Sequence, residues 1–443
     1  MLWRTVLRSS AAIWLAPFLV AFVVLLLSDD LTAGVTPRYW PSALGSASFA
    51  LPFVAPACAT AGAWEGARCT RGAVAHWAPA RSWTGVALPL LVPVLALGAL
   101  GMAVALAVPV SAGHLGAVVP PPGTVLGVVL IWLSLLAAHS FAGFLLGRRL
   151  PRVLSVPLAL LGSFAVMAYP AAMEPLWLRH MVAGGMTSCC SLDRALNWRA
   201  AASALVLALG VIAAAVAALT VLARRTRTVL VCTAVAVGLA GSGGLAYGLP
   251  ADPVTARRTD VLVCAGDAPK ICLWPEAGPP AMIREHAADA LHRLRQAGLT
   301  VPTALTMAAG SDTSPNPDHD PNASHGPAFI GLWRNPTPSE VRAGVGAALL
   351  PADPAACADS RRSSGTEDTY APTVVWLALT AGTDPRLMAG RYGPEANAVA
   401  ARVLRAPRSE QLAWFTRNYR ALTDCTTRPA PVPAPRGQEE AAR

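Results

Sequence analysis

The sequence has almost no lysine and few charged residues of any kind. Of its 443 residues 14% are charged, and the 35 basic ones are all arginine except Lys270. A P-loop needs a Gly-Lys pair at the nucleotide phosphates, and Lys270 follows Ala268-Pro269, so a standard P-loop ATPase site is excluded. The H-E-x-x-H and G-x-S-x-G patterns are also missing. We therefore predict a protein that is not an enzyme, with no catalytic residues, no metal site and no cofactor.

Charge is missing above all from long apolar runs in the first 249 residues. A bilayer core needs about 20 apolar residues as helix, because lipid offers the backbone no hydrogen bonds. Seven runs meet this need without any Asp, Glu, Lys or Arg. They cover residues 11–28, 47–64, 84–108, 124–147, 153–173, 200–223 and 228–249. Asp29-Asp30 follow the first run in place of a small-residue cleavage site, so we interpret it as a span and not as a signal peptide. The sequence predicts an α-helical membrane bundle of about seven transmembrane helices over residues 1–249.

Arginine is concentrated in every second gap between these runs. One set of gaps holds Arg4, Arg8, Arg68, Arg71, Arg81, Arg148, Arg149, Arg152, Arg224, Arg225 and Arg227, whereas the other set holds only Arg38, Arg179, Arg194 and Arg199. Arg257 and Arg258 follow the last run. Positive residues stay in the cytoplasm, so we expect a plasma-membrane protein with a cytoplasmic N-terminus and an extracytoplasmic C-terminal domain. Because this pattern accounts for much of the net charge of +10, we expect no nucleic-acid partner.

The C-terminal part, residues 250–426, reads as a small α+β domain. Residues 260–275 form two β-rich runs around Gly-Asp-Ala-Pro, which predicts a hairpin. An amphipathic helix is predicted over 279–297, strands over 301–307 and 328–333, and further helices over 339–350, 370–380, 394–404 and 409–422. Residues 427–443 are rich in Pro and Ala and then charged, so we predict a disordered tail.

Six of the nine cysteines fall on the side predicted to be oxidising, which favours disulfides. Cys264 and Cys272 flank the predicted hairpin, and we expect them to pair. Cys357 with Cys425 is then the second expected bridge. The adjacent Cys189 and Cys190 do not easily bond each other, and three alternatives stay open for them. They are free thiols, they pair between subunits, or they bond a cysteine of the C-terminal domain.

The longest predicted cytoplasmic connection, residues 64–83, reads WEGARCTRGAVAHWAPARSW. Glu65, Arg68 and Arg71 recur at spacings of three and so share one helical face. One interpretation is an ordinary positive loop with an interfacial turn, and the other is a docking helix for a cytoplasmic partner.

The same residues carry a family resemblance. The run of spans, the short basic N-terminal segment and the charged helical loop after the second span resemble the permease subunits of type-2 ABC exporters. More narrowly, residues 1–225 resemble actinobacterial ABC transporter permeases in which W-E-x-x-R and A-P-x-R-S stretches precede the third span. The resemblance implies that Glu65, Arg68 and Arg71 couple to a separate ATP-binding subunit. The seventh span and the outer domain depart from the usual six-span plan.

Within the predicted spans, His139 is the only ionisable residue apart from cysteines and tyrosines, and it stands beside Ser140. An ionisable residue in a membrane is a functional hypothesis by default, although a neutral imidazole bonded to a neighbouring helix explains it as well. The spans contain no charged residue, which disfavours an ion or proton relay.

These observations leave two main hypotheses of function. The first is a permease-like subunit of an export or resistance system, acting with a separate ATPase in a homo- or hetero-oligomer. The alternative is a membrane-anchored receptor or assembly factor whose outer domain binds a ligand or a protein. An extracellular enzyme on a membrane platform is a weaker third, because no catalytic set is visible.

Overall fold

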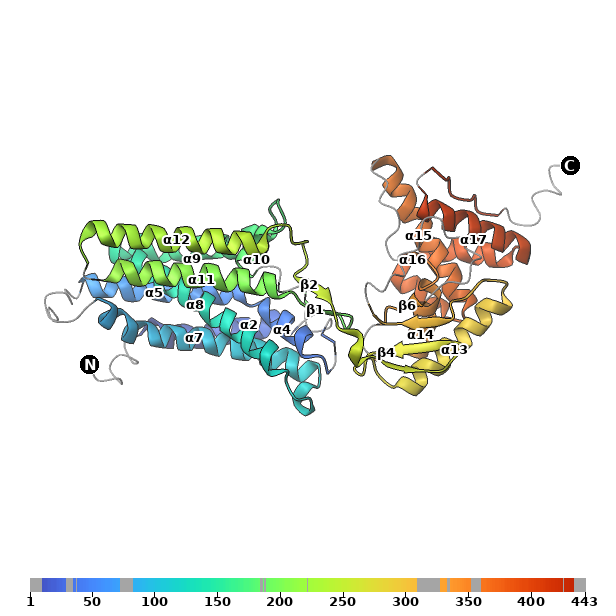
Figure 1. Cartoon of the computed structure of the whole chain (residues 1–443), viewed down its shortest axis with the longest axis horizontal. Coiled ribbons are helices and arrows are strands. Elements are labelled where there is room, and N and C mark those ends of the chain that lie inside the picture. The colour runs from blue at the N-terminus through green and yellow to red at the C-terminus, as the bar shows by residue number, and fades with distance from the viewer. Residues whose placement is uncertain are drawn as a thin grey trace. The chain divides into compact units, whose positions relative to one another are not determined.

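The computed structural model describes residues 10–433 apart from a few short segments (Figure 1). The segments not described are 29–34, 37, 72–82, 184–185, 187–188, 221, 309–326, 333–334, 352–359 and 425, and the side chains of 117 and 360–368. The chain divides into two compact units, Met1–Thr255 and Ala256–Arg443, and each is described by itself.

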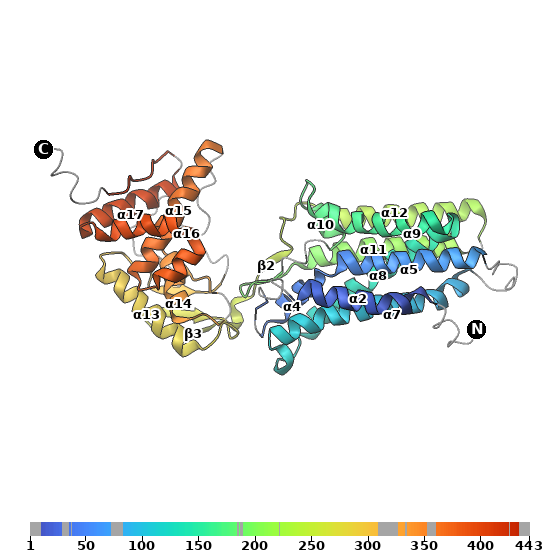
Figure 2. The ribbon, with the colours of Figure 1, turned by 180° about the vertical axis from the view of Figure 1, so that it is seen from behind.

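The first unit is a bundle of long helices that run side by side (Figures 1 and 2). Its α-helices are α2 (Ala11–Leu27), α4 (Trp40–Ser48), α5 (Leu51–Arg71), α7 (Trp83–Ala112), α8 (Pro122–Arg149), α9 (Arg152–Ala168), α10 (Leu178–Met181), α11 (Trp198–Leu219) and α12 (Arg224–Ala246). Short 3-10 turns η1 (Leu115–Ala117) and η2 (Tyr169–Ala171) and the strand β1 (Arg194–Leu196) complete it, and β1 pairs with β2 (Val254–Ala256). Leu91, Leu136 and Phe144 are fully buried in its core.

Several of these helices have the length and composition of membrane spans. In the described part of the chain five helices are long and apolar enough to cross a bilayer, and the bent pair α4 and α5 makes a sixth if it is one span. The outer faces are apolar as well, because Trp14 and Phe18 of α2 and Leu161 of α9 are 75%, 74% and 64% exposed. Soluble proteins rarely expose apolar surface on this scale. The helices are therefore compatible with insertion in a membrane.

The second predicted span differs from its expected bounds of 47–64. It is a pair of helices, α4 and α5, bent by 49° at a break between them. Phe49 and Ala50 close the break by donating to Ser46 O and Ala47 O, and Pro52 stands in the first turn of α5, where its missing N–H costs nothing. α5 then continues to Arg71, so Glu65 and Arg68 lie within the helix and not in a loop.

Among its described residues, the second unit has a four-stranded sheet in the order β3-β4-β5-β6 and five helices. The strands are β3 (Val263–Ala265), β4 (Lys270–Leu273), β5 (Ala304–Thr306) and β6 (Ala328–Phe329), preceded by the 3-10 turn η4 (Thr259–Val261). The helices are α13 (Pro280–Gln296), α14 (Pro338–Ala347), α15 (Ser360–Thr380), α16 (Pro385–Arg405) and α17 (Arg408–Thr423). The hairpin expected over 260–275 is present as β3 and β4, with Cys264 opposite Cys272.

The local sequence explains several of these elements. β4 and β5 are parallel because α13 crosses between them, which makes a β-α-β unit. α14 begins with a capping box, in which Thr337 Oγ1 accepts from Glu340 N while the Glu340 carboxylate accepts from Thr337 N. α16 is kinked at Gly393, whose φ of 81° favours glycine. Trp274, which follows β4, is buried, and its Nε1 donates to Met307 O just after β5 at 2.8 Å.

The structure describes the first residues of the tail that the sequence predicts to be disordered. Residues 427–433 are described, and they lie against α17. Ala430 N donates to Asn418 Oδ1 at 2.8 Å, and Arg417 Nε donates to Arg428 O at 3.2 Å. Side chains of α17 thus bond to backbone groups of this segment. Disorder of residues 427–443 stays a prediction. Residues 434–443 lie outside the described part.

Candidate functional site

The first candidate site is the end of α5 that precedes residues 72–82. Glu65 is completely buried there, and its carboxylate accepts a hydrogen bond from Ala11 N at 3.2 Å. This places a negative group at the N-terminus of α2, where unpaired backbone N–H groups and the helix dipole favour it. Arg68 of the next turn pairs with the same carboxylate at 2.9 Å. Glu65 therefore joins α5 to α2 and is not exposed to a partner.

The three residues that the sequence placed on one face differ in their environments. Glu65 is buried, Arg68 is about one-third exposed, and Arg71 is exposed at the last position of α5. The three residues do lie on one helix with the predicted spacing, but α2 covers Glu65, the first of them. The rest of the predicted docking segment, residues 72–82, lies outside the described residues.

Aromatic and basic side chains from four elements gather at the same end of the bundle. The Arg148 guanidinium lies 3.7 Å from the centre of the Trp83 ring, and the Arg152 guanidinium lies over Trp64. Such cation–π contacts stabilise arginine next to apolar surface. Arg148 and Arg152 belong to the arginine set that the charge pattern predicts to be cytoplasmic.

Small residues let α5 and α8 approach until their backbones touch. A Cβ atom added to Gly143 or Gly147 of α8 would lie 2.0 Å from Ala59 O or Ala63 O of α5. In return, a Cβ on Gly62 or Gly66 of α5 would lie within 2.4 Å of backbone oxygens on α8. Membrane helices commonly associate through such small-x-x-x-small pairs, because close contact maximises van der Waals packing. Sequence reasoning missed this interface, although the Gly-x-x-x-Gly spacing in both helices was the signal for it.

The second candidate site is the polar pair inside the bundle. His139 Nδ1 of α8 lies 2.7 Å from Ser163 Oγ of α9. Ser140, which adjoins His139 in sequence, points elsewhere and donates to Leu136 O of its own helix at 2.7 Å. The structure therefore pairs His139 with a residue that the sequence did not single out, because adjacent positions on a helix face about 100° apart.

A cavity of about 390 Å³ lies beside this pair. Its walls come mainly from α8, α9 and α11, with Ala59 of α5 and Val182. The only polar side chains that line it are His139 and Ser163. Its size falls within the range of about 300–1,000 Å³ that is typical of small-molecule pockets.

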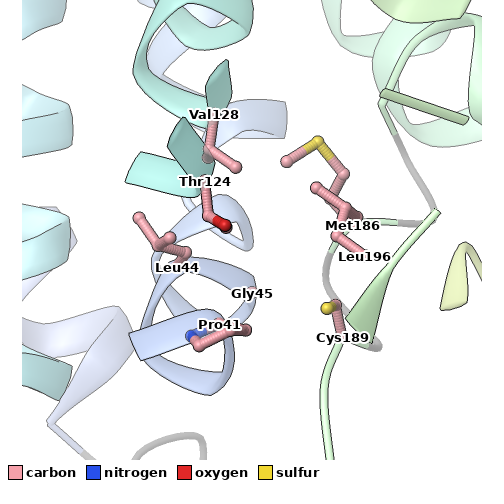
Figure 3. A pocket seen from close by; sticks show the side chains of 8 residues that line it. All are labelled: Pro41, Leu44, Gly45, Thr124, Val128, Met186, Cys189 and Leu196. Carbon is pink, nitrogen blue, oxygen red and sulfur yellow. The ribbon is translucent and has the colours of Figure 1, made fainter. Parts of the chain in front are cut away.

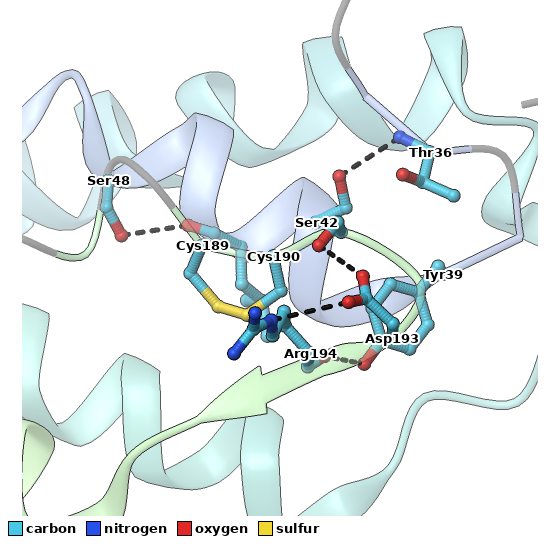
Figure 4. Close-up of a disulfide and its surroundings, with 10 residues drawn as sticks. Thr36, Tyr39, Ser42, Ser48, Cys189, Cys190, Asp193 and Arg194 are labelled. Carbon is cyan, nitrogen blue, oxygen red and sulfur yellow. Dashed lines mark hydrogen bonds and ion pairs between the residues drawn. A yellow bond between two sulfur atoms is a disulfide. The ribbon is translucent and has the colours of Figure 1, made fainter. Parts of the chain in front are cut away.

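The adjacent cysteines Cys189 and Cys190 are bonded to each other, as Figure 4 shows. This corrects the expectation that they do not easily pair. The peptide between them is cis and their Cα atoms lie 3.1 Å apart, which is shorter than the 3.8 Å of a trans peptide. Nearby, Tyr39 Oη donates to Arg194 O at 2.5 Å, and the Arg194 side chain pairs with Asp193 at 3.3 Å.

A second pocket, next to Cys189, is too small for a ligand. It lies between α4, the start of α8 and the segment that contains Met186 and Leu196 (Figure 3). Its volume of about 10 Å³ corresponds to about one water molecule. The backbone of Cys189 comes close to α4 at Gly45, because a Cβ atom on that residue would collide with Cys189 O.

In the second unit, Cys264 and Cys272 form the expected disulfide across the β3–β4 hairpin. Cys357 and Cys425 lie outside the described residues, so their pairing stays a prediction. Cys58 and Cys69 are free and buried, and Cys232 is free and exposed.

The ionisable residues of α13 join helices to one another. Asp289 pairs with Arg293 at 3.1 Å and with Arg342 of α14 at 3.2 Å, and Arg342 Nη2 lies 3.3 Å from His286 Nδ1. Burial opposes ionisation of Asp289, but the two guanidinium groups outweigh it and lower the pKa of its carboxyl. Within the part of the chain that the structure describes, no three His, Cys, Asp or Glu side chains are grouped as metal ligands.

Comparison with known proteins gives one result, which concerns the second unit. Residues 271–425, from β4 to just after α17, are similar to a family described as "Domain of unknown function (DUF7224)". No curated protein and no solved structure matches the chain.

Proposed function

We propose that this chain is a permease-like subunit of an ABC-type export or resistance system, whose ATP hydrolysis is supplied by a separate polypeptide. The observation that carries the proposal is the construction of the end of α5. Exposed Arg71 ends a helix that is fixed to α2 through Glu65 and to α8 through backbone contact. A partner protein that binds this end of α5 therefore moves α2, α5 and α8 together.

The proposal includes seven spans. The five long helices and the bent α4–α5 pair supply six, and α2 is a seventh apolar helix of 17 residues, about 25 Å long. That length is close to the bilayer core of about 30 Å. With the arginine-rich gaps inside, seven spans put the C-terminal domain outside the plasma membrane. The Cys264–Cys272 disulfide supports an oxidising location for that domain.

The test of partner binding is co-purification with candidate ABC-type ATP-binding subunits from the same cell. Arg68 is a poor position for a charge reversal, because a carboxylate there would face Glu65 and disturb the fold. Arg71→Glu avoids this, and we expect it to reduce ATPase recovery at least tenfold. Arg225→Glu, at an exposed arginine of α12 on the same predicted face, is the matched control and is expected to bind normally. Equal recovery of ATPase with Arg71→Glu and wild type would rule out a coupling role for Arg71.

Topology is tested separately with a membrane-impermeant maleimide. In a Cys232→Ser background, Ser409→Cys at the exposed start of α17 is expected to react in intact cells. Arg71→Cys is expected to react only after lysis. The opposite pattern would reverse the proposed orientation. A chain that shows the proposed topology but never recovers an ATPase favours the alternative of an anchored receptor or assembly factor, with the second unit as the binding domain.

A further inference from the structure

The cavity between α8, α9 and α11 has one polar feature at the middle of the membrane. His139 is ten residues from Arg149 at the end of α8, and Ser163 is eleven residues from Arg152 at the start of α9. At 1.5 Å per residue both side chains lie about 15 Å from the arginine rim, which is half of a bilayer core of about 30 Å. The cavity therefore lies at the depth of the lipid tails.

The wall of the cavity is apolar everywhere else. Leu135, Leu158, Val166, Leu207 and Val211 contribute most of the bulky side chains. Leu158 and Val166 are about half exposed on the outer surface of the bundle, so the cavity adjoins the surface that faces lipid. A ligand would enter it from the hydrocarbon and not from water.

The His139–Ser163 hydrogen bond leaves one nitrogen without a partner. A neutral imidazole carries one N–H donor and one acceptor nitrogen. Nδ1 is bonded to Ser163 Oγ, and among the described residues nothing bonds to Nε2. In hydrocarbon an unpaired polar group of this kind costs free energy, because no water replaces the missing partner.

We propose that this cavity binds a neutral lipid-like alcohol, with the hydrocarbon body against the apolar wall and the hydroxyl group on His139 Nε2. A hydroxyl both donates and accepts, so it completes the hydrogen bonding of His139 in either tautomer. This inference rests on the membrane placement proposed above and does not depend on the ATPase.

Other lipid classes fit the cavity less well. A phospholipid keeps its charged headgroup at the interface and would place only methylene groups beside His139. A fatty acid would bring a carboxylate to mid-membrane, where the wall offers no cation. A plain hydrocarbon fills the volume but leaves Nε2 unpaired.

The experiment uses the full-length chain in phosphatidylcholine nanodiscs, without any ATPase. The probe is hexadecanol that carries a photoreactive diazirine, and the reference probe is the matching alkane without the hydroxyl. We expect the alcohol to label peptides of α8 and α9 at least about fivefold more than the alkane, since a hydrogen bond in an apolar site is worth about 1 kcal/mol or more. Competition by unlabelled hexadecanol or by a branched isoprenoid alcohol distinguishes straight from branched hydrocarbon bodies.

Two variants with matched controls test the position of the site. Gly162 lines the cavity and has open space where a Cβ would lie, so Gly162→Leu fills the cavity and is expected to abolish labelling. Gly127→Leu adds the same side chain on α8 away from the cavity, also into open space, and is expected to label normally. In His139→Phe the alcohol and the alkane are expected to label about equally. Ser140→Ala is expected to keep the preference of wild type for the alcohol.

Equal labelling by alcohol and alkane in the wild type would overturn the role of the hydroxyl. Labelling that survives in Gly162→Leu would show that the alcohol does not bind in this cavity. Loss of ATPase binding in the co-purification experiment has no bearing on either result, so the two proposals fail separately.

Discussion

The carboxylate of Glu65 accepts a hydrogen bond from the backbone of Ala11, 54 positions earlier in the chain, at 3.2 Å. The only acidic residue of α5 thus caps a different helix while its own helix supplies Arg68 as counter-charge. The contact explains why a carboxylate is tolerated with no exposed surface at the end of an apolar bundle.

This arrangement predicts unequal effects of removing the two partners of the ion pair. Glu65→Ala removes both the cap of α2 and the partner of Arg68, and we expect it to destabilise the first unit by about 2–3 kcal/mol. Arg68→Ala removes a charge that is about one-third exposed and leaves the bond to Ala11, so a smaller loss of about 1 kcal/mol is expected. Thermal unfolding in detergent measures both. Equal losses for the two variants would mean that the cap contributes nothing.

Backbone contact between α5 and α8 predicts that a single methyl group disrupts the bundle. In Gly143→Ala the new Cβ would lie 2.0 Å from Ala59 O, which forces the helices apart. We expect a loss of about 1–3 kcal/mol, as for other overpacked cores. Gly127→Ala is the control on the same helix, because nothing lies within 4 Å of its Cβ position. Size-exclusion chromatography after heating compares the two variants, and identical melting would rule out the close contact.

His180 predicts a pH dependence of stability. Its side chain is 1% exposed, and Nε2 donates to Pro250 O at 2.7 Å. Burial lowers the pKa of His180 below its ordinary value of 6.5, although the bond to Pro250 opposes the change. Because the unfolded chain takes up the proton first, the stabilisation is complete above about pH 6.5 and decreases as the pH falls below it.

The measurement is the melting temperature of the full chain between pH 8 and pH 5. Wild type is expected to lose more stability over this interval than His180→Gln, which has no group that titrates there. The difference is at most about 1.4 kcal/mol per pH unit. Parallel curves for the two proteins would assign the pH dependence to other groups.

The hairpin disulfide predicts a redox-sensitive second unit. Cys264 and Cys272 are separated by eight positions, and closing a loop of this size stabilises a fold by about 2–3 kcal/mol through the entropy of the unfolded chain. The double variant Cys264→Ser/Cys272→Ser is expected to lose that amount of unfolding free energy and so to melt at a lower temperature than wild type. Reduction of wild type with dithiothreitol is expected to reproduce the shift, and reduction of the variant is expected to add little of it. A variant as stable as wild type would contradict this role.

Much of the second unit follows from local pattern. The amphipathic run over 279–297 became α13, the Gly-Asp-Ala-Pro turn became the β3–β4 hairpin, and the helix expected over 409–422 became α17. The parallel pairing of β4 with β5 was not visible, because it depends on which strands meet after the crossover. The hydrogen bonds of Asn418 and Arg417 to Ala430 and Arg428 were not visible either, because they join side chains of α17 to a later segment.

The apolar helices, the gaps in which arginine is concentrated and the Cys264–Cys272 pair could be predicted from the chain alone, because they depend on composition and on neighbours in sequence. Three contacts became visible only in the folded chain: Glu65 caps α2, His139 bonds Ser163 and not the adjacent Ser140, and α5 and α8 touch at their glycines. Each of these contacts joins helices whose relative rotation and depth no single helix specifies. Packing chooses them, since only one rotation of α8 brings Gly143 and Gly147 against α5 while turning His139 toward α9.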